Sequence, residues 1–254
     1  MTAELGISSE DAVTPDGMRI YAIGDIHGCH DLMAEMHRRI MAEIMADRPK
    51  DWRIVYLGDY VDRGPDSRQV IDFLAHATQT DPRVIALAGN HDIGFLSFLS
   101  EPRAECMFAA YGGEATARSY GVTIDFHPPE VLARGHAALQ EAMPHHHMKF
   151  LHSLKLSATF GDFFFAHAGI RPGVPLDAQS SGDLVWIREQ FLEFRGLHPK
   201  VVVHGHTPAA SAEILPNRIN LDTRAFHSGR LTAMAFEGGR KRLLEVTRSI
   251  EPAG

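Results

Sequence analysis

Two aspartates and an arginine, Asp59, Asp62 and Arg63, lie close together in a glycine-flanked segment of this chain. Carboxylates bind cations or handle protons, and a guanidinium binds anions such as phosphate, so these residue types suggest a site rather than a scaffold. The segment follows residues 53–57, whose β-branched and aromatic content is typical of a buried strand. Ligands bind at the carboxyl ends of such strands in open α/β sheets. By itself, the segment could equally be a turn in which an aspartate caps the next helix.

Two further apolar runs end in polar groups of the same kinds. Residues 18–23 lead to Asp25 and His27, which are two positions apart and project to the same side of an extended segment, where they can share one cation. A third run leads to Asn90 and His91. Each cluster alone is weak evidence, because an aspartate can cap a helix beside an exposed histidine. Three clusters in register at successive strand ends would bring these side chains into one crevice.

The segments between the clusters predict the elements that position them. Apolar residues at four-residue spacing, starting at Leu32 and closed by Pro49, predict an amphipathic helix, so residues 18–57 are expected to form a βαβ unit with two parallel strands. A second helix is predicted near Pro65, and the third strand covers 83–88.

The stretch from 93 to 152 is less regular, and we expect it to be a mainly helical insertion over the cleft. His145, His146 and His147 invite a metal interpretation. However, three consecutive residues of a helix point in different directions and cannot all face one ion. We therefore expect only a partly exposed helix start there.

Short strands dominate the remaining sequence, and two of them lead to histidines. A predicted hairpin over 156–165 is followed by His167, and the apolar run 201–203 is followed by His204 and His206. The closing strands, expected to be antiparallel, are predicted at 219–222, 231–236 and 243–246.

Composition limits the class of protein. The chain has 254 residues, of which 44% are hydrophobic, and this suits a single domain over 18–254. Residues 1–17 do not resemble a signal peptide and are expected to be a flexible leader. A net charge of −7 argues against a nucleic-acid partner, and we expect no membrane span. With only Cys29 and Cys106 a disulfide framework is not expected, so we predict a cytoplasmic protein. We make no prediction about the oligomeric state.

The collected donor atoms are oxygen and nitrogen, without thiolate, which suits manganese, iron or zinc. Six protein ligands are too many for one catalytic ion that keeps an open position, but they suit two ions that share a carboxylate. Asp59, in the middle of the series, is the natural bridge. The predicted ligands are Asp25, His27, Asp59, Asn90, His167 and His206.

Five motifs, GDIHG, GDYVDRG, GNHD, HAG and GHT, follow in this order between Gly24 and Thr207. They resemble the signatures of metallophosphoesterases of the phosphoprotein phosphatase type, and the bacterial serine/threonine protein phosphatase-like branch is most similar. The resemblance implies an α/β fold, the calcineurin-like four-layer αββα sandwich, in which two mixed sheets are flanked by helices. It also implies two metal ions at the strand ends, with Mn²⁺ expected and iron or zinc as alternatives.

The resemblance also distributes the ligands between the two ions. His204, two residues before the last ligand, would lie behind the site rather than bind metal. One ion would be held by Asp25, His27 and the bridging Asp59, and the other by Asp59, Asn90, His167 and His206.

The remaining motif residues would act on the substrate. By resemblance, His91 would be the general acid and Asp62 would orient it. Arg63 and Arg188 would bind phosphate, and Asn90 would face the substrate as well as the metal. A hydroxide formed between the two ions would attack phosphorus in line.

These assignments imply a metal-dependent phosphatase. The expected activity is that of a serine/threonine protein phosphatase, with a phosphorylated protein or a small phosphoester as substrate. A symmetrical dinucleoside tetraphosphate hydrolase is the alternative, because such enzymes share the same ligand set. A catalytically silent scaffold is a third interpretation.

One motif departs from the family pattern. The segment from Leu221 to Ala225 resembles an Asp-Thr-Gly-Ala element, but Arg224 stands in place of the glycine. Glycine adopts positive φ freely, so the substitution puts the local turn in question, and Arg224 could instead reach the rim of the substrate site.

Overall fold

The computed structural model describes residues 6–248 and contains two five-stranded mixed sheets. In the first sheet, β1 (Met18–Ile23) is parallel to β2 (Asp51–Tyr56), which is parallel to β3 (Val84–Ala86). On the other side of β1, β9 (Arg230–Glu237) and β10 (Arg240–Thr247) continue the sheet as antiparallel strands. The parallel pair predicted within residues 18–57 is confirmed.

The second sheet has the order β4-β5-β6-β8-β7. The strands β4 (Ser157–Phe160) and β5 (Phe163–Ala166) form the predicted hairpin, and β5 is parallel to β6 (Val201–His204). The strand β8 (Arg218–Asn220) is parallel to β6 and antiparallel to the short β7 (Glu213–Ile214). The prediction of a purely antiparallel strand near 219–222 is therefore wrong, because the connection through β7 returns the chain in the direction of β6.

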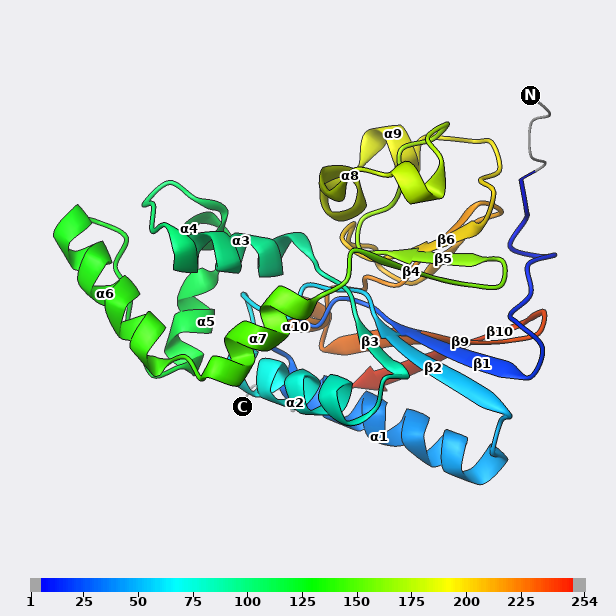
Figure 1. Cartoon of the computed structure of the whole chain (residues 1–254), viewed down its shortest axis with the longest axis horizontal. Coiled ribbons are helices and arrows are strands. Elements are labelled where there is room, and N and C mark those ends of the chain that lie inside the picture. Colours follow the sequence, from blue (N-terminus) through cyan, green and yellow to red (C-terminus); the bar gives the residue numbers. More distant parts are fainter. Residues whose placement is uncertain (1–5, 249–254) are drawn as a thin grey trace, which may run out of the picture.

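Helices cover the outer face of each sheet, so the molecule has four layers (Figure 1). The helices α1 (His30–Asp47) and α2 (Ser67–Thr80) lie on the first sheet, and α8 (Ser181–Trp186) and α9 (Glu189–Leu192) lie on the second. This arrangement is the sandwich implied by the motifs.

The central strand β1 is apolar on both faces because both faces are buried. Ile20 and Ala22 belong to the cluster between the sheets, together with Phe165. Tyr21 and Ile23 belong to the cluster that includes the buried side of α1. Side chains alternate along a strand, so β1 joins two hydrophobic layers and its carboxyl end is held firmly by both.

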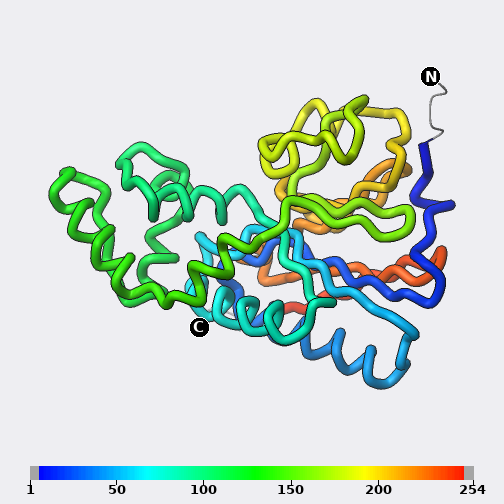
Figure 2. The backbone as a smooth tube through the Cα atoms, viewed as in Figure 1, coloured from blue at the N-terminus to red at the C-terminus, as the bar shows by residue number. Residues whose placement is uncertain are grey.

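Five helices form an arm that extends beyond the sheets (Figures 1 and 2). The arm occupies the stretch for which a mainly helical insertion is predicted, but its first helix already begins at Asn90. Its elements are α3 (Asn90–Ser100), α4 (Met107–Ala110), α5 (Gly113–Ser119), α6 (Pro129–Ala142) and α7 (His145–Ser153).

The described part of the N-terminal segment packs against the sandwich. The amide of Ile7 donates to the carbonyl oxygen of His198 at 3.0 Å, and the amide of Ser9 donates to that of Pro216 at 2.7 Å. Ala12 is fully buried in the cluster between the sheets. Residues 6–17 thus differ from the flexible leader expected there, because they supply a core side chain and paired backbone groups.

The described residues also form two short elements, the 3₁₀ helix η1 (Leu176–Ala178) and α10 (Ala225–Ser228). Within residues 6–248, none of the helices has both the length and the apolar composition that a membrane span requires.

Candidate metal centre

The carboxyl ends of strands from both sheets meet at one cleft of about 330 Å³. Two of the predicted site residues, Asp62 and His167, lie directly behind its wall, where they contact His91 and Asp59, respectively. The structure therefore brings all the predicted site residues together. The other eight line the cleft: Asp25, His27, Asp59, Arg63, Asn90, His91, Arg188 and His206.

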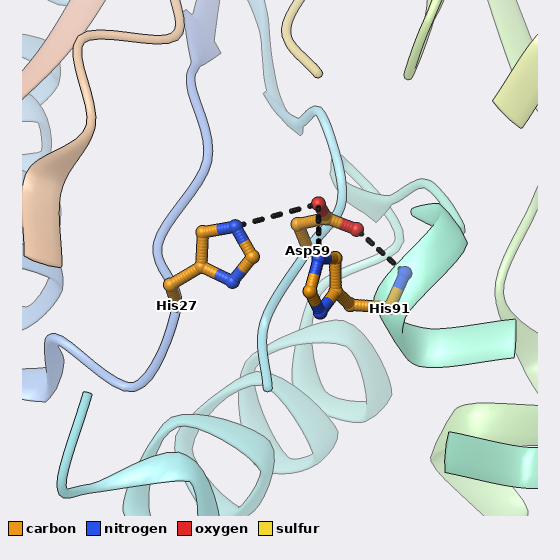
Figure 3. A group of neighbouring side chains, drawn as sticks. All are labelled: His27, Asp59 and His91. Carbon is orange, nitrogen blue, oxygen red and sulfur yellow. Dashed lines mark hydrogen bonds and ion pairs between the residues drawn. The ribbon is translucent and has the colours of Figure 1, made fainter. Parts of the chain in front are cut away.

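Asp59 lies at the centre of this group. Its Oδ2 is 3.5 Å from Nε2 of His27 and 4.0 Å from Nε2 of His91, and its Oδ1 is 3.4 Å from Nε2 of His167. Figure 3 shows the rings of His27 and His91 on two sides of the carboxylate. Two sets of donor atoms, each within 4.8 Å of one another, share Asp59: one with His27 and His91, the other with His167 and His206. A single carboxylate between two donor sets is the arrangement that a bridging ligand requires.

The hydrogen bonds of two histidines test whether a cation fits. Nδ1 of His167 is 2.9 Å from the carbonyl oxygen of Leu57, so Nδ1 carries the proton, because a carbonyl only accepts. Nε2 then turns a lone pair toward Oδ1 of Asn90 at 2.9 Å and Oδ1 of Asp59. Burial lowers the pKa of His167, which keeps the ring neutral. These facing lone pairs repel one another unless a cation lies among them, so the donor set fits a metal ion.

His27 repeats the pattern on the other side of Asp59. Its Nδ1 donates to the carbonyl oxygen of Val61 at 2.8 Å, which leaves the lone pair of Nε2 facing Asp59. Burial lowers the pKa of His27 to about 4, so this ring is also neutral near pH 7. Each donor set therefore contains an oriented neutral imidazole.

Three carboxylates are buried together at this site. Asp25 and Asp59 are each 2% exposed and Asp222 is 4% exposed. Burial, together with Asp222 and Asp59, raises the pKa of Asp25 well above its usual range, and burial raises the pKa of Asp222 to about 6. Burial would also raise the pKa of Asp59, but the histidines around it lower it below the ordinary value. Bound cations would neutralise the charge that these groups share.

His206 and Arg188 are linked at the cleft wall. Nδ1 of His206 is 2.8 Å from Oδ1 of Asn90, and Nε of Arg188 donates to Nε2 of His206 at 3.1 Å. A His206 whose Nδ1 binds a cation carries its proton on Nε2 and can no longer accept from Arg188. Metal binding would therefore free the guanidinium for an anion in the cleft.

His91 and Asp62 form a hydrogen-bonded pair at 2.7 Å between Nδ1 and Oδ2. The hydroxyl of Thr116, in α5, donates to the other carboxylate oxygen of Asp62 at 2.8 Å. Burial opposes the charge on His91, but Asp59 and the hydrogen bond to Asp62 raise its pKa. The sequence contains no signal for Thr116, because it lies far along the chain in the arm.

Backbone strain is concentrated at the same place. Among residues 6–248, seven non-glycine residues have positive φ, and all but Arg48 belong to the site. Such residues persist only where the surroundings hold them, and they mark functional sites. The other six are His27, Asp59, Asp62, Arg63, His206 and Arg224.

The chain also holds Asp59 through its backbone. Both oxygens of Asp92 are used: Oδ2 accepts from the amides of Asp59 and Gly89, and Oδ1 accepts from that of Tyr60, each at 2.9 Å. Sequence reasoning gave Asp92 no role, although it stands within the GNHD motif.

Arg224 keeps the left-handed conformation that its glycine counterpart would favour, with φ and ψ both 55°. Its amide donates to Oδ1 of Asp222 at 2.9 Å, which helps hold the turn. Arg224, Arg63 and Arg188 all line the cleft. Within residues 6–248, none of these three guanidinium groups forms an ion pair with a carboxylate. The turn therefore keeps its left-handed conformation with an arginine in place of glycine, and Arg224 is strained.

Two remaining groups of histidines lie outside the cleft. His204 is fully buried, 3.0 Å from the carbonyl oxygen of Gly205 through Nδ1, and does not line the cleft. Elsewhere, the Nε2 atoms of the exposed His146 and the buried His147 lie 2.9 and 3.1 Å from Oδ1 of Asp72. His145 is not part of this group, as expected from the directions of successive helical side chains.

The chain is similar to known proteins over most of its length. The family model of calcineurin-like phosphoesterases matches residues 18–231. A bis(5'-nucleosyl)-tetraphosphatase PrpE [asymmetrical] of Halalkalibacterium halodurans is 25% identical over 242 residues, which cover 86% of this chain and 90% of the relative.

Solved structures show the same fold at lower identity. A protein proposed to be a diadenosine tetraphosphatase matches with a TM-score of 0.63 and 22% identity, covering 92% of this chain and 97% of its own. A protein serine/threonine phosphatase from Saccharomyces cerevisiae, similar to human PP5, matches with a TM-score of 0.56 and 12% identity, over 96% and 87% of the chains.

The first prediction concerns Gly205, where any side chain would collide with Asp25, a predicted metal ligand. A Cβ there would lie 2.0 Å from Oδ1 of Asp25. We expect Gly205→Ala to weaken Mn²⁺ binding by about 10- to 100-fold, as for loss of a ligand's support. Calorimetric titration with Mn²⁺ measures this. Gly182→Ala is the matched control, because its Cβ would meet nothing closer than 3.9 Å. Equal affinities in the two variants would contradict the placement of Asp25.

The second prediction concerns the shared carboxylate. Asp59→Asn removes the negative charge that both donor sets share, so we expect metal content and activity to fall together. Elemental analysis of the purified variant should find fewer ions per chain than in the wild type. Two tightly held ions with near-normal turnover would show that Asp59 is not the bridge.

Proposed function

Because the chain belongs to the calcineurin-like phosphoesterase family, whose members are metal-dependent phosphoester hydrolases, we propose that it hydrolyses dinucleoside polyphosphates with two bound metal ions. The observation that carries this proposal is the set of three guanidinium groups, from Arg63, Arg188 and Arg224, that line the cleft beside both donor sets and form no ion pair with a carboxylate within residues 6–248. The curated relative named above acts on a bis(5'-nucleosyl) tetraphosphate by its name, which supports the same substrate class.

The proposed ligands divide between two ions that share Asp59. Mn²⁺ is the expected ion because the donors are oxygen and nitrogen, with iron and zinc as alternatives. Such ions, when bound, polarise the phosphoryl group and let water act as a nucleophile near neutral pH. The two proposed sets are Asp25, His27 and Asp59, and Asp59, Asn90, His167 and His206.

The chain itself supplies the proton and the anion-binding groups. His91, whose pKa Asp59 and Asp62 raise against the effect of burial, would donate a proton to the leaving oxygen. Asp62 fixes the ring through Nδ1, so Nε2 is free to donate. Arg63 and Arg188 bind oxygens of the phosphoryl group that is transferred, and Asn90 lies beside them.

Arg224 extends the positive charge beyond one phosphoryl group. A phosphomonoester offers a single dianionic group, whereas a polyphosphate presents several charged groups in a row. A third guanidinium at the rim is therefore better used by a polyphosphate. A protein phosphatase activity is the second candidate, favoured by the motif order and by the fold shared with the yeast phosphatase. A cytoplasmic location, expected from the cysteine content, belongs to the same proposal.

A substrate panel tests the proposed activity. We expect kcat/KM of the Mn²⁺-loaded protein to be at least about tenfold higher for diadenosine tetraphosphate than for phosphoserine and phosphotyrosine peptides, as for one extra charged contact. A preference for phosphoserine peptides would overturn the proposal in favour of the second candidate. Analysis of the products distinguishes symmetrical from asymmetrical cleavage of the dinucleotide.

The third prediction concerns Arg224 and separates strain from function. We expect Arg224→Gly to relieve the left-handed strain and stabilise the fold by about 1 kcal/mol, while lowering kcat/KM for diadenosine tetraphosphate by about tenfold. Activity on p-nitrophenyl phosphate should change much less. Thermal unfolding and steady-state kinetics measure the two effects. Arg195→Ala, at an exposed arginine that does not line the cleft, is the control. An equal loss of activity on both substrates would contradict a role for Arg224 in binding the outer phosphates.

The fourth prediction concerns His91. A general acid contributes about 10²- to 10⁴-fold and helps most when the leaving oxygen is basic. We expect His91→Asn to retain both ions but to lose far more activity on a phosphoserine peptide than on p-nitrophenyl phosphate, whose leaving group needs no proton. Asp62→Asn should follow the same pattern more weakly. Loss of a metal ion from the His91 variant would instead make His91 a ligand.

A further inference from the structure

An apolar groove lies beside the catalytic cleft, and the chemistry described above does not use it. Its volume is about 760 Å³. One wall is formed by α4 and the residues just before it, and Trp186 contributes from the end of α8. The side chains that matter below are Glu105, Tyr111 and Trp186.

Two large aromatic rings of the groove are exposed to solvent. Tyr111 is 49% exposed and Trp186 is 47% exposed, although most other aromatic side chains of the described chain are buried or partly buried. Exposed apolar surface at the rim of a polar site is typical of ligand-binding grooves. About half of the surface of each of these two residues is therefore free to contact a ligand.

The groove adjoins the cleft. The ring centroid of Trp186 is 6.1 Å from that of His206, and the ring centroid of Tyr111 is 6.1 Å from that of His91. The guanidinium of Arg63 lies over the ring of Tyr111, 5.5 Å from its centroid. A ligand whose phosphate is held in the cleft would thus extend directly between these aromatic side chains.

We propose that this groove binds the nucleobase of the substrate, which stacks on Trp186 with Tyr111 at the other wall. The inference rests on the proposed function and names the part of the substrate that the metal centre does not hold. Trp186 is two residues before Arg188, so one short segment offers a flat ring to the base and a guanidinium to the phosphate. Base stacking on exposed aromatic rings is a general mode of nucleotide binding.

The polar rim of the groove suits a base as well. Glu105 lines the groove, is exposed, and forms no ion pair with any residue between 6 and 248. Its carboxylate can accept from an exocyclic amino group such as that of adenine. An extended peptide, in contrast, gains affinity by pairing with a strand edge, whereas α4 and the end of α8 supply ring faces and apolar side chains.

Binding of small fragments to the Mn²⁺-loaded protein tests the inference without turnover of the dinucleotide. Adenosine monophosphate and inorganic phosphate are the probes, and calorimetry gives both dissociation constants. We expect adenosine monophosphate to bind at least about tenfold more tightly than inorganic phosphate, because the base adds stacking. Trp186→Ala should abolish this difference, and Trp186→Phe, which keeps a ring, should retain most of it.

Leu243→Ala is the control, since Leu243 is 43% exposed on β10 and does not line the groove. It should bind both probes as the wild type does. Equal binding of the two probes by the wild type, or a difference that survives in Trp186→Ala, would overturn the inference. A phosphoserine peptide whose binding depends on Trp186, when that of adenosine monophosphate does not, would overturn it in favour of a protein side chain.

The outcome is separable from that of the proposed function. Trp186-dependent binding of adenosine monophosphate by a protein that does not cleave diadenosine tetraphosphate would support the groove and contradict the proposed activity. Cleavage of the dinucleotide with a KM that is the same in the wild type and in Trp186→Ala would support the activity and contradict the groove.

Discussion

The negative charge buried around Asp59 is the constraint on which the rest of the site depends. Asp25, Asp59 and Asp222 lie together where water is nearly excluded, and neutral histidines turn lone pairs toward the same point. An uncompensated buried charge costs several kcal/mol, so such an arrangement is stable only with cations or protons among its members. Metal ions fit this arrangement better than protons do, because the neutral imidazoles beside the carboxylates point lone pairs, and not N–H groups, toward the shared point.

The two sheets make this arrangement possible. Each strand end contributes one or two donors, and the core between the sheets fixes the strand ends relative to one another. Close approach then requires glycine: a Cβ on Gly89 would lie 2.1 Å from Oδ1 of Asp59, as one on Gly205 would collide with Asp25. Left-handed backbone at six residues of the site is the remaining cost, and the stability of the sandwich offsets it.

The donors could be predicted from the sequence because each follows an apolar strand in a short motif. The βαβ start, the hairpin and the donor side chains from Asp25 to His206 were all recognisable in this way. Contacts between distant segments were not: Thr116 reaches Asp62 from the arm, and Asp222 enters from the strand region near the end of the chain. The packing of residues 6–17 and the parallel pairing of β8 also depend on long-range contacts, which periodicity within a segment does not encode.

In the proposed complex, different parts of the molecule would hold different parts of the substrate. The strand ends would hold the reacting phosphoryl group, Arg224 would hold further phosphates, and α4 of the arm with the end of α8 would flank the base. All of this depends on two cations that share Asp59. Anomalous diffraction from crystals grown with Mn²⁺ tests that claim most directly. It should show two peaks about 3.5 to 4 Å apart, on either side of the Asp59 carboxylate. A single peak in the cleft, or ions bound only at Asp72 and its histidines, would contradict it.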